Sequence, residues 1–365
     1  MTSPLVSPRC RTLRGSLLVL LLLSLSSRGQ AETPGPLAPA APAAPAARAP
    51  VFELRALGVL GGDDDTNLSC YLLGRAGEAT APLMIDGGSV VPGIVRMLER
   101  DGRLAPDASW SVRMKAVLEV LRPVRALLLT HAHLDHLAGF VIKTTLDLTL
   151  TNEGRPALEI VGLPATLEAV RTVALKPPLW ADFTSIPAGN PTLRLAPLPP
   201  GTQREIGPFR IQLAPLRHPV DSAGFLVTVG EDAYLHLGDT SASEAVWALA
   251  RPPLARGRLR AVAIEVSFPA AKETLAAATG HLTPRSLLVE LAKLAGLPGT
   301  PEAARMSETE ARALAGRLGP RLRGCTIVAI HIKALEYDQV VAELEALRAA
   351  GLPLLIPQQG ERYRF

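Results

Sequence analysis

Short apolar runs and longer segments with helical spacing alternate along the chain from residue 51 onward. The runs predict strands at 51–60, 68–73, 83–85, 124–130, 158–161, 209–214, 224–229, 233–237, 261–265 and 326–330. Apolar residues at helical spacing predict helices at 109–121, 164–174, 284–295, 307–317 and 336–349. Strands that are dense early and interleaved with helices later favour an α/β fold in which helices cover sheets.

The first residues follow a different pattern. Three arginines precede the apolar stretch Leu17 to Leu25, and Gly29-Gln30-Ala31 then offers small residues at a cleavage point. This layout is typical of a secretory signal peptide, and the stretch is short for a membrane span. We expect a signal peptide over 1–31, a Pro/Ala-rich linker over 32–50 and one domain over 51–365, with a periplasmic or secreted location. An uncleaved membrane anchor is the alternative.

Composition and charge narrow the class of protein. The 365 residues are 48% hydrophobic, which is enough for a large core. Lysine and arginine exceed the acidic residues by four, and the segment 1–31 holds four arginines and no acid. The mature chain is therefore neutral, which speaks against a nucleic-acid polymer as partner. Two cysteines, Cys70 and Cys325, would remain; their pairing and the number of chains in an assembly stay open.

The most informative motif is His131-Ala132-His133-Leu134-Asp135-His136, which follows the apolar run 126–129. Neutral imidazole is the commonest metal ligand near pH 7, and aspartate adds an anionic oxygen. Two histidines separated by one residue converge from one side, whereas the last two side chains of the motif reach a second position. One turn of chain could therefore serve two metal ions.

Other candidate ligands also follow predicted strands. His218, Asp239 and His331 each come directly after an apolar run, and Gly238 allows a tight turn before Asp239. α/β folds build active sites from side chains at strand ends along one sheet edge. His236 lies inside a predicted strand, and we interpret it as structural.

These features resemble one branch of the metallo-β-lactamase superfamily. HxHxDH, a later isolated histidine, a GDT aspartate and a final strand-end histidine are similar to the superfamily pattern. HAHLDHLAGFVIKT, LWADF, IEVSFP, GHLTP and HIK resemble the class II cyclic nucleotide phosphodiesterases, over residues 52 to 365. Ala181 departs from the Trp-Pro pair expected in LWADF. The resemblance implies a metallo-β-lactamase-like αβ/βα four-layer sandwich with two divalent metal ions.

The resemblance also implies a ligand set. One metal takes His131, His133 and His218, the other takes Asp135, His136 and His331, and Asp239 bridges them. Zinc suits these nitrogen and oxygen ligands best, with manganese or iron as rivals. Asp86, at the end of an apolar run, is implied to orient a ligand histidine or the bridging water; the alternative is an aspartate that only begins a turn.

His281 in GHLTP has no strand before it, so we interpret it as a general acid and not as a ligand. Glu265, at a strand end, is expected to pair with it and raise its pKa. The alternative is a histidine that merely precedes the helix at Pro284. Lys333 and Ser222 are candidate contacts for a substrate phosphate.

The predicted activity is hydrolysis of small-molecule 3′,5′-cyclic nucleotides, cAMP or cGMP, to 5′-nucleotides. Attack on phosphorus would come from a hydroxide that bridges the two metals. The alternatives are another hydrolase of the same fold (a lactonase, thioesterase or RNA-processing nuclease) and a non-catalytic binding protein on the same scaffold. GxSxG, HExxH and GxxxxGK[ST] are all missing from the sequence.

Overall fold

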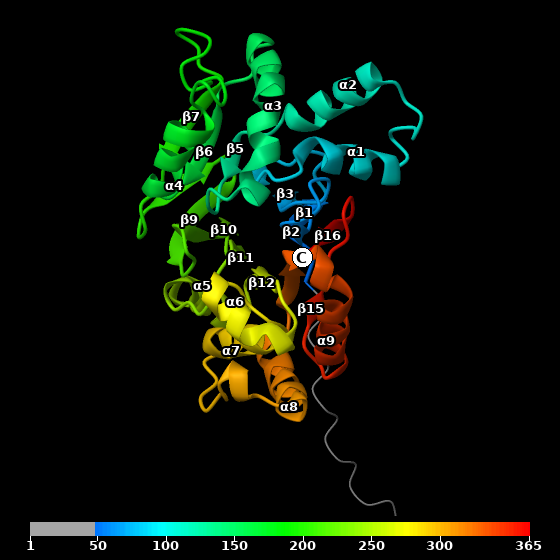
Figure 1. The fold of residues 1–365 in the computed structure, drawn as a ribbon, viewed down its shortest axis with the longest axis vertical. Helices are drawn as coiled ribbons and strands as arrows, with labels where there is room; N and C mark the ends of the chain where they lie inside the picture. The colour runs from blue at the N-terminus through cyan, green and yellow to red at the C-terminus, as the bar shows by residue number, and fades with distance from the viewer. Residues whose placement is uncertain (1–47) are drawn as a thin grey trace, which may run out of the picture. The chain divides into compact units, whose positions relative to one another are not determined.

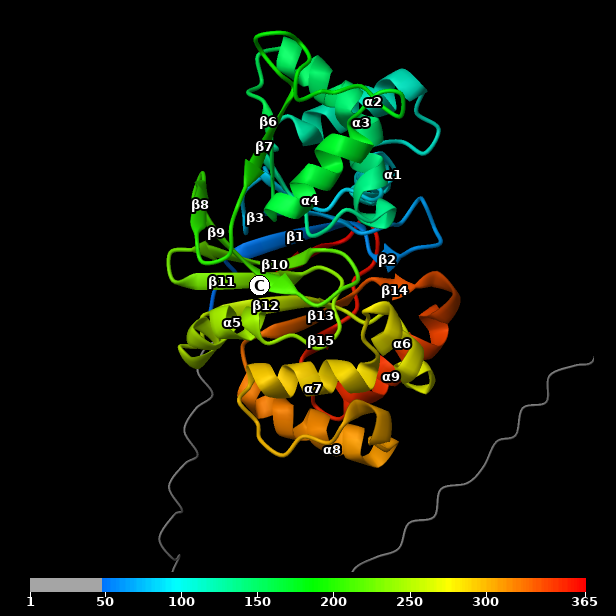
Figure 2. The same ribbon diagram turned by 60° about the vertical axis from the view of Figure 1, so that its left-hand side comes forward.

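Two seven-stranded sheets pack face to face in the computed structural model, which describes residues 48–365 (Figure 1). Helices cover the outer side of each sheet, as the second view shows (Figure 2). This is the predicted αβ/βα arrangement of four layers. These described residues form one compact unit. The predicted signal peptide and all but the last three residues of the predicted linker lie outside the described residues.

The first sheet is antiparallel at one end and parallel from its centre to the other end. Parallel pairing joins β4, β5, β6 and β7, whereas the first four strands pair antiparallel. The strands in spatial order are β16 (Arg362–Arg364), β1 (Phe52–Gly58), β3 (Cys70–Arg75), β4 (Leu83–Ile85), β5 (Ala126–Leu128), β6 (Leu158–Gly162) and β7 (Leu193–Pro197).

The second sheet has the same mixed character. Its strands in spatial order are β15 (Leu354–Leu355), β13 (Thr326–Ile330), β12 (Leu259–Glu265), β11 (Asp232–Leu237), β10 (Ser222–Val229), β9 (Phe209–Leu216) and β8 (Gln203–Ile206). β11, β12, β13 and β15 run parallel, so their carboxyl ends meet at one edge. A short parallel pair, β2 (Leu60–Gly61) with β14 (Ile332–Lys333), lies beside this edge.

Alternation of side chains along each strand divides the apolar residues between two cores. In and after β5, Ala126 and Leu128 face the space between the sheets, whereas Leu127 and Leu129 face the helices of the first sheet. A period of two is what an extended strand imposes. Because both faces of strands such as β5 and β13 are buried, these strands are continuous apolar runs, which the sequence analysis located.

The helices divide by sheet. α1 (Val90–Arg100), α2 (Trp110–Leu121), α3 (Leu134–Asn152) and α4 (Pro164–Ala169) cover the first sheet, and one π-helical turn, η1 (Val170–Ala174), continues α4. The second sheet is covered by α5 (Ala245–Ala255), α7 (Pro284–Leu294) and α9 (Tyr337–Ala349), while α8 (Glu308–Leu318) packs on α7 and α9. α6 (Glu273–Thr279) connects β12 to α7 through a short 3-10 turn. Among residues 48–365, every helix is too short or too polar to span a membrane.

Four helices were not predicted, and α3 is the most instructive. It begins inside the HxHxDH motif and buries several polar side chains, among them Lys143, Thr144 and Asp147, so its inner face does not look apolar in the sequence. Arg155 and Lys143 both pair with Asp147, which satisfies the buried charges. α1 and α5 contain proline, which hides a helical pattern, and α6 is short.

Candidate metal centre

The predicted ligands meet at the edge where strands of both sheets end. β5 of the first sheet leads into the HxHxDH turn, and α3 begins within that turn. From the second sheet, His218 follows β9, Asp239 follows β11 and His331 follows β13. Because β11 and β13 flank β12 in parallel, these chain ends lie close together despite their separation in sequence.

The first cluster consists of His131, His133, His218 and Asp239, whose ligand atoms lie within 4.8 Å of one another. The Nε2 atoms of His131 and His218 are 3.1 and 3.2 Å from Nδ1 of His133. Nitrogens held 2.0–2.1 Å from a tetrahedral zinc ion lie about 3.3 Å apart. The three imidazoles therefore have the spacing of a ligand set.

The second cluster consists of Asp135, His136, Asp239 and His331, again within 4.8 Å. Nε2 of His331 lies 3.2 Å from Oδ2 of Asp135 and 3.3 Å from Oδ2 of Asp239. Nε2 of His136 lies 3.4 Å from Oδ1 of Asp239. Asp239 belongs to both clusters, and its Oδ2 is also 3.7 Å from Nε2 of His131. The arrangement places the predicted bridging residue between the two clusters.

One buried atom tests whether these residues fit a cation. Nε2 of His136 is buried without a hydrogen-bond partner in residues 48–365, and its approach to Asp239 lacks hydrogen-bond geometry. An orphaned polar atom in a protein interior is costly unless a ligand satisfies it. The donor set of imidazole nitrogens and carboxylate oxygens suits a divalent cation, so the residues fit the metals that the fold implies.

Protonation differs between the two clusters. Burial, reinforced by neighbouring imidazoles, lowers the pKa of His131 well below its usual range, and burial lowers the pKa of His133 and His218. Neutral imidazole is the form that binds metals. Burial alone would lower the pKa of His136, but the carboxylates of Asp239 and Asp86 raise it well above its usual value. The carboxylates around His136 therefore favour a positive charge beside them, either a proton on the ring or a bound cation.

Asp86 supports one histidine of each cluster. Its Oδ2 accepts a hydrogen bond from Nδ1 of His136 at 2.7 Å, and the Thr130 hydroxyl donates to the same carboxylate. Thr130 Oγ1 in turn lies 3.1 Å from Nδ1 of His131. With Nδ1 engaged, each imidazole directs Nε2 into its cluster. Asp86 has φ 52°, a left-handed conformation that aspartate tolerates better than most residues.

His218 and His331 are held in the same way from other elements. Nδ1 of His218 donates to the carbonyl of Gly280 at 3.0 Å. Gly280 has φ 79° and its missing Cβ would lie 2.8 Å from the His218 ring, so glycine is required there. Nδ1 of His331 lies 3.1 Å from the Ser267 hydroxyl. Gly238, predicted to allow a tight turn, has an ordinary φ; its role is close packing, because a Cβ would lie 2.5 Å from Thr130.

Glu265 and His281 form a hydrogen-bonded pair. Oε1 of Glu265 accepts from Nδ1 of His281 at 2.9 Å, and His281 keeps 9% of its surface exposed. Burial would lower the pKa of His281, but the Glu265 carboxylate raises it overall. Glu265, His281 and His331 also satisfy a metal-ligand spacing. Glu265 nevertheless accepts hydrogen bonds from backbone Thr240 and Leu282 and from Ser267, so its oxygens need no cation.

Ser267 is the residue that the sequence reasoning missed. Its hydroxyl donates to Oε2 of Glu265 at 2.6 Å and accepts from His331, which links the Glu265–His281 pair to the second cluster. Thr130, which links Asp86 to His131, was missed as well. Both are small hydroxyl residues beside recognised motif residues, and the only available signal was their position in IEVSFP and in the strand end before HxHxDH.

The two candidate substrate contacts differ. Nζ of Lys333 lies 3.9 Å from Oδ2 of Asp135, and the side chain keeps 20% of its surface exposed, so it borders the second cluster. Ser222 is buried and its hydroxyl donates to the carbonyl of Asp239 at 2.9 Å. Ser222 therefore supports the shared aspartate in this structure and is not placed to meet a substrate, which corrects the sequence-based interpretation.

Three features lie outside the site. His236 is buried in β11 beside Tyr234, and burial lowers its pKa to about 3, in keeping with a structural role. Cys70 and Cys325 are free and buried.

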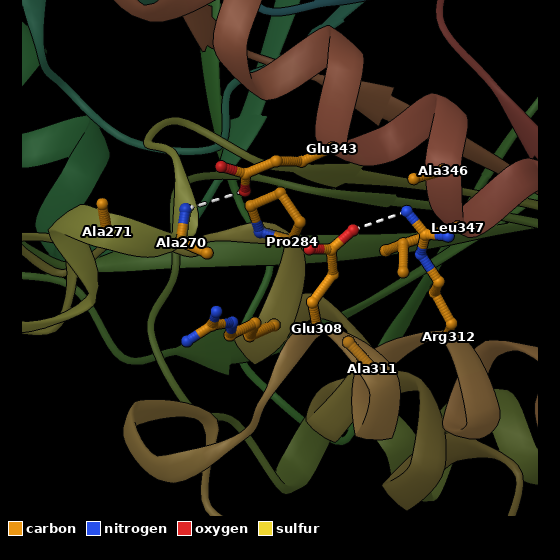
Figure 3. A pocket seen from close by; sticks show the side chains of 10 residues that line it. Ala270, Ala271, Pro284, Glu308, Ala311, Arg312, Glu343, Ala346 and Leu347 are labelled. Atoms are coloured by element: carbon orange, nitrogen blue, oxygen red, sulfur yellow. Dashed lines mark hydrogen bonds and ion pairs between the residues drawn. The ribbon is translucent and has the colours of Figure 1, made fainter.

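A small apolar pocket of about 220 Å³ lies between Ala270 and helices α7, α8 and α9, where the Glu343 carboxylate accepts a hydrogen bond from the Ala270 amide (Figure 3). None of the predicted site residues lines that pocket.

Comparison with known proteins identifies the relatives. The family described as cAMP phosphodiesterases class-II matches residues 107–351, which contain every predicted ligand together with Glu265 and His281. The chain is 27% identical over 336 residues to the probable 3′,5′-cyclic-nucleotide phosphodiesterase of Yersinia pestis, covering 86% of this chain and 89% of that protein. It is 26% identical over 335 residues to the 3′,5′-cyclic-nucleotide phosphodiesterase of Aliivibrio fischeri, covering 86% and 93%.

Solved structures agree on the fold. Unliganded yeast PDE1 superposes with a TM-score of 0.68 at 21% identity, covering 87% of this chain and 99% of that chain. The metallo-β-lactamase fold protein YhfI from Bacillus subtilis superposes with a TM-score of 0.55 at 16% identity, covering 86% and 100%. The predicted metallo-β-lactamase-like sandwich is confirmed, and so is the family resemblance. With its four layers, its strand-end ligand clusters and a family match over two thirds of its length, the chain belongs to the class II cAMP phosphodiesterases.

Proposed function

We propose that this chain hydrolyses 3′,5′-cyclic nucleotides to 5′-nucleotides with two divalent metal ions. The observation that carries this proposal is the family match over residues 107–351, which spans both ligand clusters and the Glu265–His281 pair. The fold alone would not select this activity, because many reactions share one scaffold.

The two clusters are the proposed metal sites. His131, His133 and His218 hold one ion, Asp135, His136 and His331 hold the other, and Asp239 serves both. Such ions supply positive charge for the phosphate and lower the pKa of a water molecule so that it can act as a nucleophile near neutral pH. Zinc is the proposed metal, because imidazole and carboxylate ligands at this spacing suit it.

His281 is the proposed general acid. Its Nδ1 is bonded to Glu265, which leaves Nε2 to donate a proton. As the water oxygen bonds to phosphorus and the P–O3′ bond breaks, that proton passes to O3′ and neutralises the leaving alkoxide. The raised pKa of His281 keeps the ring protonated at higher pH than a free imidazole. Lys333, at the rim of the second cluster, is the proposed partner of a phosphate oxygen.

Export is part of the proposal and rests on the sequence. Arginines before the apolar stretch Leu17 to Leu25 and the small residues at 29–31 support a cleaved signal peptide and a periplasmic or secreted enzyme. Comparison of the N-terminal residue of the enzyme in its native host with the encoded sequence tests this directly. An N-terminus near residue 32 supports export, and an intact residue 1 in the cytoplasmic fraction contradicts it.

A direct assay separates this activity from the other hydrolases of the fold. The purified protein is incubated with cAMP, cGMP, an acyl lactone and a thioester, and bound metal is measured in parallel. Formation of 5′-AMP or 5′-GMP supports the proposal. Turnover of the lactone or thioester without cleavage of either cyclic nucleotide overturns it. No turnover of any of them at full metal content would favour the non-catalytic alternative.

A further inference from the structure

An apolar groove lies directly beside the first ligand cluster. Its volume is about 540 Å³, and His133 lines it from the HxHxDH turn. One wall comes from α4 and η1, and the opposite wall comes from Pro219 and Val220, which follow the ligand His218. The groove is therefore continuous with the proposed metal site through His133 and through the residue after His218.

The groove collects side chains that are unusual on a protein surface. Ten large hydrophobic residues are exposed in residues 48–365, and four of them line this groove: Leu134, Val173, Leu179 and Val220. Their exposed fractions run from 40% for Val220 to 72% for Leu134. Scattered exposed apolar side chains need no explanation, but a contiguous group next to a reactive centre marks a binding surface.

We infer that this groove takes the nucleobase of the substrate. A base is flat and uncharged, its faces are poorly hydrated, and it is attached through the ribose to the phosphate that the clusters would hold. Aliphatic walls with alanines at 165, 169 and 174 offer such a ring a smooth apolar slot. The inference rests on the proposed cyclic-nucleotide activity and adds the part of the protein that recognises the nucleoside.

The charges around the groove favour a base over a longer nucleic acid. No lysine or arginine is among the described residues that line it, and Asp221 contributes a carboxylate. A groove that tracked a phosphodiester backbone would need cations. Within residues 48–365 the Asp221 carboxylate has no hydrogen-bond or ion-pair partner, so it remains available to accept an N–H from the edge of a base.

The test compares substrates with and without a base. The wild-type protein is assayed with cAMP, cGMP and the base-free 1-deoxyribose 3′,5′-cyclic phosphate, which carries the same reacting group. Val173→Asp places a charge in the groove, away from the ligand residues. Ile142→Asp is the matched control, because Ile142 is 64% exposed against 63% for Val173 and does not line the groove.

We expect Val173→Asp to raise KM for both cyclic nucleotides about tenfold, leaving KM for the base-free phosphate unchanged. Ile142→Asp should change neither value. The inference is overturned if Val173→Asp leaves every KM unchanged, or if it raises all three equally through simple repulsion of an anion. It is also overturned if the variant changes the oligomeric state and not KM, because the groove would then be an interface. Wild-type protein that cleaves no cyclic nucleotide would overturn the proposed function itself.

Discussion

The two ligand clusters share Asp239 but differ in exposure. In the first, His133 and His218 are half-buried, and His133 borders the groove. In the second, His136 and His331 are buried, and a carboxylate or hydroxyl engages Nδ1 of each ring. Burial with bonded outer partners fixes ligands, whereas exposure leaves room for substrate. If both clusters hold the proposed ions, the buried second cluster is the better suited to retain its ion, and His133 leaves the first cluster open toward the groove.

The largest loss of bound metal and of turnover is expected at Asp239, the residue that both clusters share. Asp239→Ala removes the carboxylate common to both and leaves His136 and His331 without the anion that they face. We expect loss of both metal ions and of measurable turnover, checked by elemental analysis and by 5′-nucleotide formation. Asp107→Ala, at an exposed aspartate, is the control and should change neither. Retention of two ions in Asp239→Ala would show that the clusters do not depend on a shared ligand.

The next effect separates proton transfer from metal binding. His281→Ala should lower turnover by about 10²- to 10⁴-fold while the metal content stays at the wild-type level. The metal content should not change because Nδ1 of His281 is bonded to Glu265, not directed at a cluster. The Glu265 oxygens in turn already accept hydrogen bonds and need no cation. Turnover and elemental analysis are measured on the same preparation. Loss of one ion would instead make His281 a ligand and extend the second cluster.

A variant at Asp86 tests whether one carboxylate orients ligand histidines in both clusters. Asp86→Asn keeps the size of the side chain and tolerates the left-handed φ of 52°, but removes the charge that orients His136 and Thr130. We expect metal affinity to fall by about 10- to 100-fold at both sites. Competition with a chromogenic chelator measures the two affinities. A loss confined to one site would contradict the chain of contacts from Asp86 through Thr130 to His131.

The smallest expected loss of metal affinity is confined to the second cluster. Ser267→Ala removes the acceptor of the His331 Nδ1 proton, and we expect about a tenfold loss of affinity for one ion only. The same chelator competition reads both sites. Because Ser267 also donates to Glu265, the variant should lower turnover at saturating metal as well. Equal weakening of both sites would show that Ser267 has only a general structural role.

The sequence predicted most of the strands and the candidate ligands because both have short-range signals, whereas β7 and the short strands β8, β14, β15 and β16 were not predicted. Strands such as β5 and β13 are buried on both faces and appear as apolar runs, and His131, Asp239 and His331 follow such runs directly. The parallel order of β11, β12 and β13 then brings the later residues to one edge. The αβ/βα arrangement itself came from the family resemblance, since periodicity alone gave only an α/β class.

What could not be predicted depends on contacts between distant segments. α3 was missed because Lys143 and Asp147 are buried and paired, which breaks the expected apolar stripe. Ser222 was assigned to the substrate because its orientation toward the Asp239 carbonyl leaves no trace in the sequence. The groove combines apolar residues from three segments, which flank recognised motif residues but meet only in the folded chain.

The most direct test of the account is a metal titration of the purified protein after chelation. We expect two equivalents of zinc or manganese per chain, with cleavage of cyclic nucleotide restored only as the second equivalent binds. The same titration of Asp239→Ala should show no tight site. Full activity in the chelated protein, or saturation at a single equivalent, would contradict a centre built from two clusters that share one aspartate.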